Sequence, residues 1–89
     1  MVRKKLLVQN ETGLHLRPAG HLCEIAGKYS SQILFLHAGA EINAKSVLSV
    51  LAAGIQSGDE VELQCTGADE EEAAAAIEQL FADRFVPRA

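Results

Sequence analysis

The sequence predicts an α+β fold in which three helices cover one face of a four-stranded antiparallel sheet, in the order β-α-β-β-α-β-α. Three observations lead to this prediction. Strand-like segments occur at four places, and helix-like segments occur between and after them. Turns containing glycine or other turn-forming residues separate many of these segments. The length of 89 residues suits one domain, which we expect to span residues 1–89.

The first strand is predicted at Lys4–Val8, where Leu6 and Val8 would face a core. Leu7 interrupts the alternation and adds an apolar side chain to the outer face. Residues 10–13 read Asn-Glu-Thr-Gly, which is typical of a turn. The glycine that ends this run can adopt the positive φ that a tight connection often needs.

The first helix is predicted at Leu16–Tyr29, beginning near residues 15–17. Pro18 supports this start, because proline fits only in a first turn, where backbone N–H groups lack helical acceptors. Gly27 and the polar residues after it end the helix. The stripe expected to face the core consists of apolar residues at helical spacing: Leu16, Ala19, Leu22, Cys23 and Ala26.

A hairpin is predicted next, from strands at Ile33–His37 and Glu41–Asn43. A short helix follows at Ser46–Ala53. Ser46 suits its N-cap, and Gly54 lies where a glycine commonly follows a helix.

The outer face of the predicted sheet carries more apolar surface than a solvated sheet needs. Leu34 and Leu36 would share it with Leu7. Two interpretations are open: leucines scattered singly over the surface, or a weak contact with a second copy. We expect a monomer.

The last strand, Glu60–Thr66, has the clearest alternation of apolar and polar residues, and the last helix is predicted at Asp69–Arg84. Asp69 and Glu72 fit a capping box with aspartate in place of serine. The acidic residues 70–72 complement the positive end of the helix dipole, so we do not interpret them as a metal site. The buried stripe of this helix is expected to contain Ala73, Ala74, Ile77, Leu80 and Phe81.

The composition argues against several classes of function. The formal net charge of −4 disfavours nucleic-acid binding. No apolar segment resembles a signal peptide or a membrane span, so we expect a cytoplasmic protein without membrane insertion. Cys23 and Cys65 are far apart with no CxxC pattern; we expect buried reduced thiols, with a disulfide or a metal site as the alternative. We expect no metal and no cofactor.

A candidate site for an anion lies at His15, between a glycine turn and the start of the first helix. The free N–H groups and the dipole at a helix start favour an anion, and Arg17 adds a permanent positive charge. A neutral imidazole is also a competent nucleophile near neutral pH. The alternative is that His15 only caps or lines the helix start. His21 and His37 lack such neighbours, and we assign them no role.

Three segments of the sequence resemble one known family. Gly13–Ala19 resembles the phosphorylation-site signature of HPr, the histidine-containing phosphocarrier of the bacterial phosphotransferase system. Asn43–Leu51 is similar to the regulatory-serine region of that family, and Gly67–Glu70 is similar to the start of its last helix. The resemblance implies an open-faced β-sandwich and a stoichiometric phosphoryl carrier, not an independent enzyme.

The resemblance also implies roles and partners. His15 would carry the phosphoryl group, and Arg17 would assist it. Phosphorylated Enzyme I would donate the group, and EIIA-type domains would accept it in phosphoenolpyruvate-dependent sugar uptake. The alternatives are a carrier of the nitrogen-related branch and a regulatory adaptor that acts through protein binding alone.

Ser46 has two interpretations. It can simply cap the short helix, or it can be a regulatory site for HPr kinase/phosphorylase, as the resemblance implies.

A docking surface for partners is expected beside His15. It would consist of Leu16, Gly20, Val47, Leu48 and Leu51. Leu16 departs from the small residue that is common at this position in the family, so it bears on which partners dock. The alternative for the short helix is burial on both of its sides.

Overall fold

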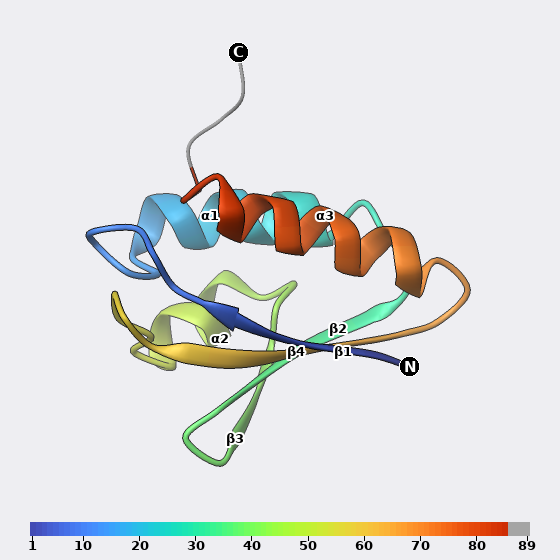
Figure 1. The fold of residues 1–89 in the computed structure, drawn as a ribbon, viewed down its shortest axis with the longest axis horizontal. Coiled ribbons are helices and arrows are strands. Elements are labelled where there is room, and N and C mark those ends of the chain that lie inside the picture. Colours follow the sequence, from blue (N-terminus) through green and yellow to red (C-terminus); the bar gives the residue numbers. More distant parts are fainter. Residues whose placement is uncertain (86–89) are drawn as a thin grey trace.

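The computed structural model describes residues 1–85. Its elements are β1 (Val2–Leu7), α1 (Leu16–Ala26), β2 (Gln32–His37), β3 (Ala40–Asn43), α2 (Val47–Ala52), β4 (Glu60–Thr66) and α3 (Glu70–Ala82). Helices α1 and α3 lie side by side over the sheet, and α2 packs against α1 and β3 (Figure 1). The α+β fold with four antiparallel strands and three helices is therefore confirmed.

The strands form one antiparallel sheet in the order β1-β4-β2-β3. The cleanly alternating strand β4 is central and pairs with β1 and β2, placing Leu63 opposite Lys4 on one side and Phe35 on the other. Since side chains alternate between the two faces of a strand, this register puts the buried residues of β1, β2 and β4 on one face.

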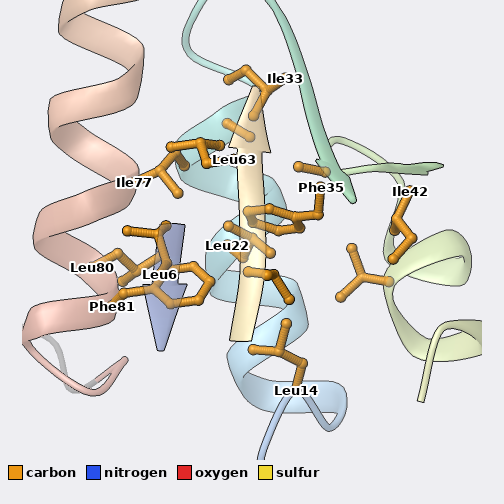
Figure 2. Close-up of a cluster of buried hydrophobic side chains, with 14 of the residues drawn as sticks. Leu6, Leu14, Leu22, Ile33, Phe35, Ile42, Leu63, Ile77, Leu80 and Phe81 are labelled. Carbon is orange, nitrogen blue, oxygen red and sulfur yellow. The ribbon is translucent and has the colours of Figure 1, made fainter. Parts of the chain in front are cut away.

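The core lies between this face and the helices. Figure 2 shows Phe35 near its centre, among side chains contributed by α1, α3 and the strands. Phe35 is fully buried and meets Phe81 edge to face, with ring centroids 5.6 Å apart. Phe81 in turn contacts Phe85, at 4.9 Å between centroids. The predicted buried stripe of the last helix is confirmed in full: Ala73, Ala74, Ile77, Leu80 and Phe81.

The first helix begins at Leu16 as predicted, but it differs from its prediction in where it ends and in the burial of its first residue. It ends at Ala26 instead of Tyr29, because the N–H groups of Lys28 and Tyr29 bond to carbonyls only three residues back and no longer continue the α-helical pattern. At the other end, Leu16 is 69% exposed and does not belong to the core stripe. The first strand is also displaced from the predicted Lys4–Val8: it begins at Val2 and ends at Leu7.

The capping box predicted for the last helix is wrong. Asp69 is the N-cap, but its side chain makes no cap bond. Its carboxylate instead accepts hydrogen bonds from the backbone N–H groups of Ser30 and Ser31, each at 2.9 Å, and from the Ser31 hydroxyl. These bonds, led by that of the Ser31 hydroxyl, lower the pKa of Asp69 to about 2. The carboxylate that reaches back to the helix start belongs to Glu70, not Glu72, and it accepts the N–H of Gly67 at 3.1 Å.

Candidate functional site

His15 is the N-cap residue of α1, and its backbone is extended, with φ −76° and ψ −172°. Its carbonyl oxygen accepts the N–H of Ala19 at 2.9 Å, which begins the helical hydrogen bonds. Its side chain makes no cap bond, and the residue is exposed. The alternative that the imidazole serves as the helix cap is therefore wrong, and the ring is accessible to another protein.

The helix start that His15 caps carries backbone donors and, two residues further on, the cationic side chain of Arg17. The first turn leaves the N–H groups of Leu16 and Arg17 without helical acceptors, while Pro18 has no N–H. Arg17 is exposed, and within residues 1–85 its guanidinium forms no ion pair. An anion bound at this helix start would thus meet backbone donors, and the nearby arginine is not neutralised by an ion pair among the described residues.

The loop before His15 is held by hydrogen bonds of its own and by one to a distant loop. The side-chain amide of Asn10 donates to the Gly13 carbonyl at 2.6 Å, and the Gly13 N–H returns a bond to the Asn10 carbonyl at 3.3 Å. The next residue, Leu14, is buried and donates its N–H to the carbonyl of Ile55 at 3.0 Å. The loops before α1 and β4 accordingly lie at the same end of the molecule (Figure 1).

Gly13 is required where these two loops meet. Its φ is +65°, a conformation that side chains disfavour. A Cβ atom there would lie only 2.8 Å from both the Cα of Gln56 and the carbonyl oxygen of Ile55. The turn predicted at residues 10–13 is confirmed, and the close approach to a second loop adds a reason for glycine.

A hollow of about 310 Å³ opens beside the histidine. His15 and Thr12 line it on one side, and Gln56 and Ser57 of the second loop line it on another. Leu51 of α2 also lines it, so one of the predicted docking residues is brought to the histidine.

The predicted docking residues are exposed to different degrees. Leu16 of α1 is 69% exposed and Leu48 of α2 is 80% exposed, whereas Val47 and Leu51 are half-buried. Gly20 has no atom within 4 Å of the position that a Cβ would occupy, so the surface of α1 is open there. Because α1 packs against α2, two neighbouring helices expose large apolar side chains, one of them directly after His15 in the sequence.

Ser46 is the N-cap of α2, as predicted. Its hydroxyl accepts the N–H of Ser49 at 3.2 Å, and the residue is half-buried. Val50 of this helix and Ile55 after it are buried, while Ala53 is only half-buried.

The two cysteines are free, which excludes a disulfide between them. Cys65 is buried and Cys23 half-buried, and burial raises the pKa of both thiols. Among residues 1–85, no three side chains of the metal-binding types cluster to hold a metal ion. No helix in the same part of the chain is long and apolar enough to cross a membrane.

Sequence reasoning missed the residues that support His15 from a distance. Asn10 was predicted only as part of a turn, although an asparagine three residues before a glycine often bonds to nearby backbone groups. The contact with Ile55 had no local signal, because 40 residues separate it from His15.

The fold and the site define an open-faced α+β protein that presents an accessible histidine at a helix start. The family model described as the PTS HPr component phosphorylation site matches residues 2–83. The phosphocarrier protein HPr of Treponema pallidum is 39% identical over 85 residues, covering 96% of this chain and 97% of its own. The HPr of Cupriavidus necator is also 39% identical, over 87 residues and 96% of each chain.

A solved structure agrees over the whole length. The crystal structure of HPr-C-His from Thermoanaerobacter tengcongensis matches with a TM-score of 0.94 and 36% identity, covering 100% of both chains. The chain therefore belongs to the HPr family of phosphocarriers of the phosphotransferase system. As a member of that family it is a phosphoryl carrier and not an enzyme.

Proposed function

We propose that His15 is the residue that carries the phosphoryl group and that Arg17 stabilises the charge which arrives with it. The observation that carries this proposal is the accessible imidazole at a helix start, followed two residues on by an exposed arginine with no ion pair in the described part of the chain. A phosphoryl group adds a charge of roughly −1.5 to −2, which the helix start and the arginine favour.

The chemistry needs only a transfer between two nucleophiles. A ring nitrogen of His15 attacks phosphorus with its lone pair, a phosphorus–nitrogen bond forms, and the bond to the donor breaks with its electrons returning to the donor. In the second transfer the acceptor attacks and the imidazole leaves as the neutral base. No group other than phosphoryl is exchanged, so the carrier returns unchanged.

The partners follow from membership of the family. Enzyme I and EIIA domains are the partners of this family. We propose that phosphorylated Enzyme I is the donor and that the EIIA domain of a sugar permease is the acceptor in phosphoenolpyruvate-dependent sugar uptake. Competition between a sugar-type and a nitrogen-type EIIA domain tests this choice. Faster transfer to the sugar type supports it, whereas faster transfer to the nitrogen type assigns the carrier to that branch.

The experiment for the site itself is labelling with phosphoenolpyruvate and Enzyme I, followed by intact-mass measurement. We expect one acid-labile phosphoryl group on the wild type and none on His15→Ala. His21→Ala serves as the matched control, because His21 lies on the same helix and should not affect labelling. If His15→Ala is labelled as strongly as the wild type, the proposal is wrong.

We further propose that partners dock on the exposed leucines of α1 and α2, Leu16 and Leu48, with Gly20, Val47 and Leu51 beside them. Apolar side chains next to the transferring atom suit a partner that binds briefly, because their burial provides affinity without a fixed set of hydrogen bonds.

Ser46 is proposed as a regulatory phosphorylation site for HPr kinase/phosphorylase. A phosphate at the N-cap of α2 would add charge beside Leu48 without unfolding the helix, and so would weaken docking of an apolar partner. Incubation with that kinase and intact-mass measurement test this. Phosphate on the wild type but not on Ser46→Ala supports Ser46 as the site. Equal amounts of phosphate on both proteins would contradict this role of Ser46.

A further inference from the structure

An unexpected pair of side chains lies at the end of β2, on a strand far from His15 in sequence. The Nε2 atom of His37 is 3.1 Å from the Oδ2 atom of Asp59, and the two side chains are 18% and 36% exposed. A carboxylate only accepts hydrogen bonds, so Nε2 must carry the hydrogen and donate it. The imidazole is thereby fixed to the chain just before β4.

Asp59 is also the organiser of the turn before β4. The same Oδ2 atom accepts the N–H of Gln56 at 2.9 Å, and the N–H of Asp59 donates to the Gln56 carbonyl at 3.0 Å. Its carbonyl accepts the N–H of Val8 at 2.9 Å, while Val8 accepts the N–H of Gly58 at 2.8 Å. One carboxylate therefore joins the end of β2 to the loop 54–59.

The loop 54–59 is the support of the histidine site. It accepts the Leu14 N–H on the carbonyl of Ile55, it leaves no space for a side chain at Gly13, and it lines the hollow beside His15. A change in its position is transmitted to the residue before His15 through a backbone hydrogen bond and a close backbone contact.

We propose that His37 is a positioning residue for phosphoryl transfer at His15, acting through Asp59 and the loop 54–59. The proposal rests on the proposed function of His15. The physical basis is that transfer needs the attacking nitrogen close to phosphorus and aligned with the bond that breaks, and small displacements are costly. His37 is a positioning residue in this proposal because it acts through Asp59, and it is not one of the proposed docking residues.

The test is single-turnover transfer from phosphorylated Enzyme I, measured over a range of carrier concentrations. His37→Phe removes the donor and keeps a planar ring, and we expect the maximal rate to fall about tenfold, less than the loss of about a hundredfold from a displacement of 1 Å. The concentration giving half the maximal rate should stay within about twofold, because docking is unaffected. His37→Gln keeps an N–H donor and should restore the maximal rate to within about twofold.

A destabilised control separates positioning from stability. Ser31→Ala removes the bond from its hydroxyl to Asp69 and should lower the melting temperature while leaving the maximal transfer rate unchanged. The backbone amide resonance of Leu14 should shift in His37→Phe and keep its wild-type position in Ser31→Ala. His37→Val, which suits a strand, provides the same comparison if the phenylalanine variant does not fold.

The outcomes are distinct. A wild-type maximal rate in His37→Phe or His37→Val, with the wild type labelled normally, would overturn the positioning role and leave the role of His15 standing. Equal slowing in Ser31→Ala, or no recovery in His37→Gln, would also overturn it. If the wild type takes no phosphoryl group at His15, the proposed function fails and the role of His37 fails with it.

Discussion

Arg17 follows His15 by two residues and is exposed, without an ion pair among residues 1–85. Hydrogen bonds between charged groups contribute about 1.5–3 kcal/mol, and the lower end applies at an exposed site. We therefore expect Arg17→Gln to slow phosphoryl transfer from Enzyme I by about tenfold, as measured by single-turnover kinetics.

Arg17→Lys is the control for charge against geometry. Lysine keeps the charge but lacks the planar fork of donors, so its transfer rate should lie between those of the wild type and the glutamine variant. A wild-type rate in Arg17→Gln would show that the arginine does not assist transfer.

Gly13 has a positive φ and no space for a Cβ atom against the loop 54–59. We expect Gly13→Ala to lower the free energy of unfolding by about 1–3 kcal/mol, since both the backbone conformation and the close contact oppose it. Urea denaturation measures this change.

Gly39→Ala is the matched control, because that glycine also has a positive φ but has open space around its Cβ position. The cost at Gly13 should exceed the cost at Gly39. Equal costs would mean that the contact between the two loops does not restrain the site.

The start of α3 is tied to the segment after α1 by the Asp69 carboxylate, and this tie predicts a pH dependence. The pKa of Asp69 is about 2 in the folded protein, below the ordinary 3.8, so the folded state binds this proton less readily than the unfolded chain does. The stabilisation is therefore complete above that ordinary value and is lost as the pH falls through it towards about 2.

Thermal unfolding between neutral and acid pH, compared with Asp69→Asn, checks this prediction. The variant should be less stable at neutral pH, and the difference from the wild type should shrink towards pH 2. Glu71→Gln, an exposed change in the same turn of α3, controls for charge at the helix start. A difference between wild type and Asp69→Asn that does not depend on pH would contradict the account.

Local signals predicted the elements, and contacts between distant segments account for most differences. Ser46 was predicted as an N-cap and bonds to Ser49 within its own helix. Asp69 was predicted as a cap by the same reasoning, but its carboxylate bonds to residues 30–31, which lie 38 and 39 positions earlier. The spacing of residues within a helix cannot show whether a carboxylate bonds to the N–H groups of its own helix or to those of a distant segment.

The site shows the same division. His15 and Arg17 lie within one short motif, so the sequence alone was enough to propose them as the site, with the resemblance to HPr supplying the step from anion site to carrier. Leu16 fits the helical period and was therefore predicted to face the core. The structure instead leaves it 69% exposed, outside the buried apolar stripe of α1. The loop 54–59 became visible as the support of the site only in three dimensions.

At the scale of the whole molecule, the two most exposed of the large apolar side chains in residues 1–85 lie on two helices that pack against each other, Leu48 on α2 and Leu16 on α1. If a partner buries Leu48, its contribution is about 1.5–3 kcal/mol. We expect Leu48→Gln to raise the dissociation constant for Enzyme I by about tenfold with little effect on stability, as measured by titration calorimetry.

Leu7→Gln is the control on another part of the surface, since Leu7 is 50% exposed and belongs to the sheet. This variant should bind Enzyme I as the wild type does. Equal weakening by both substitutions would contradict docking on the helices.

The monomeric state expected from the sequence stays a prediction. Leu34 and Leu36 prove half-buried, so Leu7 is the most exposed of the three leucines predicted on the outer face. Sedimentation of the protein is expected to give the mass of one chain, and the mass of two chains would make this face the first candidate for the contact.

The central claim is that the protein receives a phosphoryl group on His15 and passes the same group on. Its most direct test is a two-step transfer followed by intact mass: labelling by Enzyme I and phosphoenolpyruvate, purification, and mixing with an EIIA domain. We predict one phosphoryl group on the wild type, none on His15→Ala, and stoichiometric loss of the group to the EIIA domain. Labelling of His15→Ala, or a label on the wild type that the EIIA domain cannot remove, would contradict the account.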